Sequence, residues 1–321
     1  MSPSFWERDH ACVVTGCGFV GSHLVDALLD SGARVRVATG NRPPHRTHPK
    51  LEAITVDLTR PQDCLRAVEG MECVLHAAGS VGAAGTGPSA VMSGIATNLT
   101  LTANVLQAAW QGGAQRALVF SSSTAYPVID RPAREAELWD GPVFPGYLGY
   151  GWMRRYFERL AEFVARESGM GIAVVRPAAL YGPRDNFDPA TGHVVSSLIR
   201  RAVAGESPLQ VWGTGNDIRD FLHVRDFARG CLLALEHKAD CDPINLSSGI
   251  GISTGDLARL ILAALERSTT DIRFEPDWPS ALPYRVLDMT KASACLGFTP
   301  RISLSEGLAE VIAWYRAQLG G

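Results

Sequence analysis

The run Val13-Val14-Thr15-Gly16-Cys17-Gly18-Phe19-Val20-Gly21-Ser22-His23-Leu24-Val25 decides the fold. It contains an apolar strand, a glycine turn and then apolar residues at helical spacing. Because glycine lacks a Cβ, a pyrophosphate can lie against main-chain N–H groups at the positive end of such a helix. Glycines also serve plain tight turns, but at the first strand–helix junction the pattern favours dinucleotide binding. The candidate residues are Gly16, Gly18, Phe19, Val20 and Gly21.

Apolar strands and amphipathic helices alternate outward from this run. We expect strands at 11–15, 34–38, 53–56, 73–76, 116–121 and 172–176, and helices that begin near residues 18, 61, 90 and 147. This alternation predicts an α/β fold with a Rossmann-type, doubly wound parallel sheet.

The sequence changes in character after Pro177, where Pro- and Gly-rich loops separate the apolar segments. We expect a strand at 209–212 and helices near 194–204, 224–237, 255–266 and 303–319. The sequence therefore predicts an NAD(P)-binding domain at 1–176, completed by segments near 209–247. A smaller, mostly α-helical substrate-binding lobe would occupy 177–321, interleaved with the first.

Length and composition exclude several classes of protein. The 321 residues can form about two lobes, each with its own core. With a net charge of -3, the chain lacks the excess of positive charge that is typical of proteins that bind nucleic acid or a membrane surface. The apolar runs are too short to span a bilayer, and charges stand where a signal peptide needs its apolar stretch, so we expect a cytoplasmic protein. The 7 cysteines show no metal-ligand spacing, so we interpret them as apolar fillers and expect no metal.

A second motif combines the hydroxyl-rich run Phe120-Ser121-Ser122-Ser123-Thr124-Ala125-Tyr126 with Tyr150 and Arg154. Hydroxyls at the carboxyl end of a parallel strand face the crevice where ligands bind. Tyr150 and Arg154 lie one helical turn apart, and a cation beside a phenol favours the phenolate. Tyr150 alone could equally be a half-buried aromatic residue, but the serine run favours a catalytic base.

The second strand is followed by Thr39-Gly40, where many NAD-binding folds have a carboxylate for the adenosine ribose. Arg42 and Arg46 come next and would suit the 2′-phosphate of NADP, or they are solvated surface residues. NAD and NADP therefore both stay open at this point. Asp57, followed by Leu58, could bind the adenine or could cap the helix that begins near Pro61.

Together, these motifs resemble the extended short-chain dehydrogenase/reductases that act on nucleotide-diphosphate sugars. The resemblance continues through the segments 74–79, 176–183, 213–224, 245–249 and 285–288. It implies catalytic roles for Ser122, Tyr150 and Arg154. The implied cofactor contacts, besides the glycine turn, are Asp57, Leu58, Ala77, Ala78, Gly79, Asn98, Tyr150, Arg154 and Pro177. The implied substrate contacts are Ser123, Thr124, Gln210, Trp212, Arg219 and Arg285, with the two arginines on the diphosphate.

The sequence departs from the family pattern at four points. The glycine turn is one residue shorter, Arg154 replaces a lysine, and Ala179 replaces a polar residue. Ser123-Thr124 stands where the 4,6-dehydratases have an Asp-Glu pair, so the usual elimination acid and base are missing.

The length and this set of departures resemble a hexosamine 5,6-dehydratase, and the resemblance implies a specific expectation about the reaction. We expect a redox-neutral enzyme with bound NAD that forms a transient 4-keto sugar. The first candidate is 5,6-dehydration of a UDP-N-acetylhexosamine, as in antibiotic biosynthesis. The alternatives are a UDP-sugar 4-epimerase, an NADPH-dependent 4-ketoreductase and a catalytically silent dinucleotide-binding protein. Family members pair two helices across a dimer interface, so we also expect a homodimer through 90–111 and 147–166.

Overall fold

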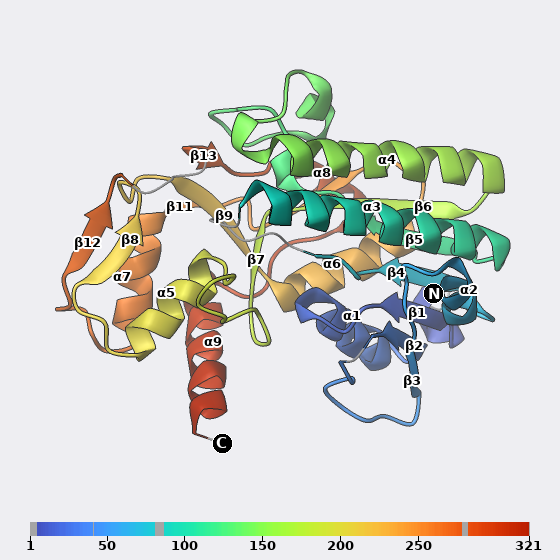
Figure 1. Cartoon of the computed structure of the whole chain (residues 1–321), viewed down its shortest axis with the longest axis horizontal. Helices are drawn as coiled ribbons and strands as arrows, with labels where there is room; N and C mark the ends of the chain where they lie inside the picture. The colour runs from blue at the N-terminus through green and yellow to red at the C-terminus, as the bar shows by residue number, and fades with distance from the viewer. Residues whose placement is uncertain (1–4, 41, 81–86, 278–281, 321) are drawn as a thin grey trace.

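The larger lobe is built on a seven-stranded parallel sheet (Figure 1). The structure is a computed structural model that describes residues 5–40, 42–80, 87–277 and 282–320. The strand order is β10-β6-β5-β4-β1-β2-β3. The bounds are β1 Ala11–Thr15, β2 Arg34–Thr39, β3 Leu51–Thr55, β4 Cys73–His76, β5 Arg116–Phe120, β6 Gly171–Pro177 and β10 Ile244–Leu246.

Helices cover both faces of this sheet. One face packs against α1 (Phe19–Asp30), α6 (Val224–His237) and α8 (Thr290–Leu296), and the other against α2 (Pro61–Val68), α3 (Pro88–Gln111) and α4 (Leu148–Ser168). Cys12 and Val14 of β1 enter the first core, whereas Val13 enters the second. Strands buried on both faces are apolar throughout, which explains the continuous apolar runs. The predicted doubly wound fold is confirmed.

The smaller lobe packs α5 (Val194–Val203), α7 (Thr254–Ala264) and α9 (Leu304–Leu319) around a separate core that includes Ile199, Leu257 and Val311. A two-stranded sheet joins β8 (Leu209–Trp212) to β12 (Ile272–Glu275). A second small sheet contains β7 (Ala179–Tyr181), β9 (Ile218–His223), β11 (Gly251–Ser253) and β13 (Tyr284–Arg285). The described residues also form four short 3-10 helices: η1 Phe5–Arg8, η2 Ser123–Ala125, η3 Glu135–Trp139 and η4 Pro145–Tyr147.

The connections between the lobes cross more than once. β10 pairs with β6 and completes the main sheet, whereas β8 pairs with β12 in the smaller lobe. The domain boundary after residue 176 stays a prediction. Five of the seven cysteines are buried, as expected for apolar fillers. Among the described residues, we find no helix that combines the length and the apolar character needed to cross a membrane.

Candidate active site

The glycine turn contains two kinds of glycine. Gly16 has φ +85°, and a Cβ there would lie 2.9 Å from the Cα of Ala78. A Cβ on Gly21 would lie 2.0 Å from the carbonyl oxygen of Gly16. Gly18, by contrast, has φ -78°, and a Cβ there would meet nothing within 4 Å. Packing within the chain therefore requires Gly16 and Gly21, whereas the space beside Gly18 is open.

The amino end of α1 fits the pyrophosphate of a dinucleotide. Its N-cap, Gly18, has no side chain to accept a hydrogen bond, and its first turn contains no acidic residue. The first N–H groups of a helix carry partial positive charge and need acceptors from outside the helix. Phe19 and Val20, at the start of this turn, are half-buried. The turn therefore offers main-chain donors to an anion.

A buried hydrogen-bonded chain holds the end of β4 beside this turn. The hydroxyl of Thr15 lies 2.8 Å from Nδ1 of His76, whose Nε2 lies 3.1 Å from the hydroxyl of Thr102. Ala77 donates its N–H to the carbonyl oxygen of Thr15 at 3.1 Å. Burial lowers the pKa of His76 to about 4, so the ring is neutral at physiological pH. The chain places Ala77 and the half-buried Ala78 against the glycine turn.

Asn98 supports the loop that follows β4. Its Oδ1 accepts the N–H of Ser80 at 2.7 Å, and its Nδ2 donates to the carbonyl oxygen of Ser80 at 2.7 Å. A Cβ on Gly79 would lie 3.1 Å from the same Oδ1. Asn98 is therefore a support for the exposed segment at Gly79, and its contact with the cofactor stays a prediction.

The candidates for the adenosine end lie after β2 and β3. Asp57 is exposed and accepts two hydrogen bonds from Thr59, which lower the pKa of its carboxyl group. The N-cap of α2 is Arg60 and not Asp57. Leu58 is buried. Arg42 and Arg46, the two arginines considered for NADP, are both exposed. Nη1 of Arg46 donates to Oδ1 of Asp26 on α1 at 3.3 Å.

The structure brings Tyr150 and Arg154 together. Nη2 of Arg154 donates to the phenol oxygen of Tyr150 at 2.5 Å, and Nη1 donates to the carbonyl oxygen of Phe120 at 2.8 Å. One guanidinium thus connects the phenol to the carboxyl end of β5. A positive group that donates to the phenol stabilises its anion, which is the form that accepts a proton.

The serine run lies against the same helix. Ser122 is the N-cap of η2, and its Oγ accepts hydrogen bonds from the N–H of Thr124 at 3.1 Å and from the Thr124 hydroxyl at 2.9 Å. A Cβ on Gly151 would lie 2.6 Å from the carbonyl oxygen of Thr124, so α4 approaches η2 closely right after Tyr150. Ser123 is buried and Thr124 is half-buried. Pro177, half-buried, ends β6.

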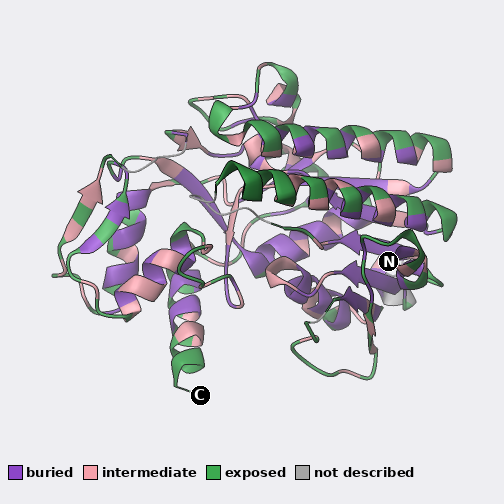
Figure 2. Ribbon diagram, viewed as in Figure 1, coloured by how far each residue is buried: buried purple, intermediate pink, exposed green. Residues whose placement is uncertain are grey.

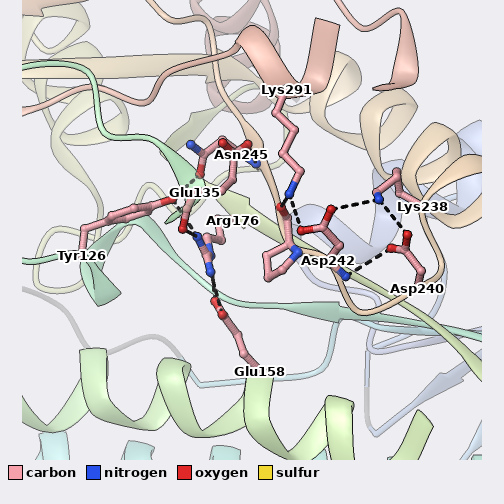
Figure 3. A network of polar contacts seen from close by, with 10 residues as sticks. Tyr126, Glu135, Glu158, Arg176, Lys238, Asp240, Asp242, Asn245 and Lys291 are labelled. Atoms are coloured by element: carbon pink, nitrogen blue, oxygen red, sulfur yellow. Dashed lines mark hydrogen bonds and ion pairs between the residues drawn. The ribbon is translucent and has the colours of Figure 1, made fainter. Parts of the chain in front are cut away.

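A buried network anchors α4, the helix that carries Tyr150 and Arg154, to the sheet (Figure 3). Arg176 of β6 donates to both carboxylate oxygens of Glu158 on α4 at 2.8 Å, and to the phenol of Tyr126 at 2.9 Å. Tyr126 donates in turn to Asn245 of β10 at 2.7 Å. Burial by itself lowers the pKa of Arg176, but its interactions with Glu158 and Tyr126 together outweigh this effect and raise the pKa. Removing one partner of such a pair would leave a buried charge, so the network fixes α4 relative to the serine run.

Two arginines from the smaller lobe lie side by side. Arg219 of β9 and Arg285 of β13 are partners in parallel register. Burial, and then the positive charge of Arg285, lower the pKa of Arg219. The guanidinium of Arg285 lies 5.3 Å from the ring centroid of Tyr147, the residue just before α4. Asp217 is the acidic neighbour of Arg219, at 3.4 Å. Two adjacent guanidinium groups suit an anion with several oxygens, such as a diphosphate.

Asp220 holds this arginine pair in place, and sequence reasoning missed it. Its buried carboxylate accepts main-chain N–H groups from Ser248 at 3.0 Å, Gly249 at 3.1 Å and Leu287 at 3.3 Å. It therefore joins β9 to the segments beside β11 and β13. Burial raises the pKa of this carboxyl group. An acidic residue within an otherwise apolar segment, Asp220-Phe221-Leu222, was the available signal.

The remaining substrate candidates lie on a different sheet. Gln210 and Trp212 are exposed on β8, which pairs with β12 at the far end of the smaller lobe (Figure 1). Gln210 donates its N–H to Glu206 at 2.9 Å. Their contact with a nucleotide base stays a prediction.

Comparison with known proteins adds to this geometry. The sequence pattern of the NAD dependent epimerase/dehydratase family matches residues 12–247. A rice protein named probable GDP-L-fucose synthase 1 is 31% identical over 306 residues, which cover 93% of this chain and 89% of the relative. The dTDP-4-dehydro-6-deoxy-D-allose reductase of Streptomyces bikiniensis is 30% identical and covers 98% of this chain and 99% of its own length. Among solved structures, the UDP-glucose 4-epimerase of Thermotoga maritima, with UDP-glucose, superimposes with a TM-score of 0.85 at 26% identity, over 96% of this chain and 99% of that one.

Proposed function

Because the chain belongs to the NAD-dependent epimerase/dehydratase family, we propose that it interconverts a hydroxyl and a ketone at C4 of a nucleotide-diphosphate sugar. The chain is an NAD-dependent enzyme of the nucleotide-sugar class. The hydrogen bond between Arg154 and Tyr150 carries the proposal, because it gives the site a phenol prepared for proton transfer.

Each end of the site has a separate task in this proposal. Tyr150 donates a proton to the ketone oxygen in reduction, or accepts the hydroxyl proton in oxidation, while Arg154 stabilises the phenolate and Ser122 orients the sugar oxygen. Arg219 and Arg285 bind the diphosphate, and Tyr147 connects Arg285 to the start of α4. NAD, when bound at Gly16, Gly18 and Gly21, supplies the acceptor or donor of hydride at C4.

Reduction of a 4-keto sugar is the net reaction that this site supports best. Reduction requires one proton donor beside the ketone, and Tyr150 is available for it. The S. bikiniensis relative, which covers nearly the whole chain, carries the name of a reductase that acts on a 4-dehydro sugar. We therefore place the reductase ahead of the redox-neutral alternatives.

The 5,6-dehydration expected from the sequence demands more of the site. The C5–H bond must lose its proton to a base, and O6 must leave as water with the help of an acid. Ser123 is 3% exposed, and the hydroxyl of Thr124 donates to Ser122. Neither residue is a strong base. Dehydration and 4-epimerisation are therefore the competing outcomes that the experiment must separate.

The experiment supplies the purified enzyme with nucleotide-linked hexoses, N-acetylhexosamines and 4-keto-6-deoxy sugars, each with NAD, NADH or NADPH. Mass spectrometry and proton NMR identify the product. We expect a gain of two hydrogens and stoichiometric loss of reduced cofactor from a 4-keto sugar. Loss of water would establish the dehydratase, and an unchanged mass with a new C4 coupling would establish the epimerase. No conversion of any sugar would contradict the proposal and favour the silent protein.

We also propose a homodimer through α3 and α4. Figure 2 shows these neighbouring helices with exposed residues along their outer surfaces. The exposed side chains of α4 include Leu148, Trp152, Tyr156 and Phe163, which follow one stripe. A contiguous exposed apolar surface of this kind is typical of a protein interface. Light scattering should give twice 34.5 kDa for the native chain and 34.5 kDa for Trp152→Glu with Tyr156→Glu. A native monomer at micromolar concentration would contradict the proposal.

A further inference from the structure

Arg184, in the loop that follows β7, reaches the helix that begins at the glycine turn. Its Nε donates to Oγ of Ser22 at 3.0 Å, and its Nη2 lies 2.9 Å from Nδ1 of His23 and 2.7 Å from Oδ2 of Asp26. All three partners lie on α1, whereas the loop leads into α5 of the smaller lobe. One side chain therefore connects the two lobes.

His23 of α1 makes a second connection, from the helix to the main chain of the loop. Its Nε2 lies 2.9 Å from the carbonyl oxygen of Pro183. An imidazole that accepts at Nδ1 and donates at Nε2 is the neutral form. Burial lowers the pKa of His23 to about 4, in agreement with that assignment. The loop is thus bonded to α1 through both its main chain and its side chain.

The backbone conformation of Arg184 would suit glycine better, so the presence of arginine indicates that its side chain has a function. Arg184 has φ +66°, in the left-handed region that glycine adopts at no cost and other residues seldom occupy. Such a conformation persists only where the surroundings compensate for it. Here the compensation is the set of contacts with Ser22, His23 and Asp26.

The network extends to the segment that follows β2. Asp26 also accepts from Nε2 of His45 at 2.9 Å and from Arg46 at 3.3 Å, both in the segment after β2. Ser22 donates its N–H to the carbonyl oxygen of Gly18, so Arg184 is bonded to the first turn of α1. The loop and the segment after β2 are thus both bonded to the first two turns of α1, whose amino end would hold the pyrophosphate.

We infer that Arg184 is a positioning residue that holds the smaller lobe against the cofactor helix and slows the dissociation of NAD. For the cofactor to leave the amino end of α1, the elements around that end must separate, and the contacts of Arg184 oppose this separation. The inference rests on NAD binding, and it does not depend on which sugar reaction follows.

A nearby ion pair provides a matched control. Arg225 of α6 is bonded to Glu310 of α9, and both line a cavity of about 430 Å³ together with Arg184 and Trp314. This pair also connects the larger lobe to α9, but its hydrogen bond does not involve α1. Arg225→Met therefore tests whether any ion pair between the lobes has the same effect.

The experiment measures how fast NADH leaves the enzyme when excess NAD is added, using the fluorescence of bound NADH. Arg184→Met and Arg184→Gly should release NADH at least about tenfold faster than the native enzyme, because they lose charged hydrogen bonds. Arg184→Gly also relieves the backbone strain, so it should fold as well as the native chain. Arg225→Met should stay within about twofold of the native rate.

Two results would overturn the inference. One is a native release rate in Arg184→Gly, and the other is equal acceleration in Arg225→Met. Failure to detect any NADH binding by the native enzyme would also overturn it, together with the cofactor assignment. Failure of the proposed reaction is distinguishable, since it would leave the contrast between the two variants intact while no sugar product forms.

Discussion

The end of the site where we propose that the cofactor binds is shaped by main chain and close packing. The end where we propose that the substrate binds is shaped by charged side chains. At the glycine turn, Gly16 and Gly21 allow backbone segments to approach within distances that no Cβ permits. At the other end, Arg219 and Arg285 are set side by side by β9, β13 and the carboxylate of Asp220. Substitutions at the glycine turn should therefore act through steric overlap, whereas substitutions of the two arginines should act through loss of positive charge.

Tyr150 lies between the two ends and should separate chemistry from binding. Tyr150→Phe removes the proton-transferring oxygen but keeps the ring, so turnover should fall by about 10² to 10⁴. The affinities for NAD and for the nucleotide sugar should change little. Steady-state kinetics and equilibrium binding on the same preparation test this prediction. Near-native turnover would show that another group transfers the proton.

The two kinds of glycine should respond differently to alanine. Gly21→Ala places a Cβ in contact with main chain and should destabilise the fold by about 3 kcal/mol or more. Gly18→Ala has an allowed φ and open space, so the free energy of unfolding should change by less than about 1 kcal/mol. It should nevertheless weaken NAD binding, because the methyl group occupies the space beside the main-chain donors. Denaturant unfolding and NAD titration measure both effects. Unchanged NAD affinity in Gly18→Ala would place the pyrophosphate elsewhere.

Acid should destabilise the folded chain through His76, the buried ring beside the glycine turn. The folded chain binds a proton at His76 only near pH 4, whereas the unfolded chain binds one near 6.5. The unfolded state therefore holds more protons between these values, and the free energy of unfolding falls as the pH decreases from about 6.5 to about 4. His76 alone should account for a loss on the order of 3 kcal/mol. Urea unfolding at several pH values gives the free energy of unfolding as a function of pH. Between about pH 6.5 and pH 4, this free energy should change less steeply with pH for His76→Gln than for the native chain. His237→Gln, at an exposed site, is the control, and an equal change in its slope would contradict the prediction.

Substitutions in the arginine pair should lower the affinity for the substrate and leave the affinity for NAD unchanged. Arg219→Ala or Arg285→Ala should weaken binding of the nucleotide sugar by about 1.5 to 3 kcal/mol, since each removes a charged contact. NAD affinity should be unchanged. Calorimetry with each ligand in turn tests the separation. A parallel loss of NAD affinity would mean that the arginines bind a different ligand.

Arg154→Lys should have the smallest effect. Lysine keeps the positive charge near Tyr150 but cannot reproduce the planar pair of bonds to Tyr150 and Phe120. We expect turnover within about tenfold of the native value, that is, about 1.4 kcal/mol. Arg154→Met, which removes both the charge and the two hydrogen bonds, should lose more activity. Equal activity in the two variants would show that the charge is not required.

Much of the larger lobe could be predicted from local patterns. The strands at 11–15 and 73–76 and the helix at 224–237 have the predicted bounds, because each contains enough apolar residues at one period to identify it. The short strands β7, β11 and β13 were not predicted, since two or three residues carry no periodicity. These strands exist because they pair with β9, and β7 and β13 lie far from β9 in the sequence.

The sequence by itself determined the order of strands and helices, the glycine turn and the spacing of Tyr150 and Arg154, because these properties belong to adjacent residues. Only the tertiary structure decided which distant residues meet. The pairing of Arg219 with Arg285, the bond from the Leu287 N–H to Asp220 and the reach of Arg184 to α1 all follow from how separate segments pack. Packing depends on complementary surfaces and on satisfying buried polar groups, and neither property can be measured along a single stretch of chain.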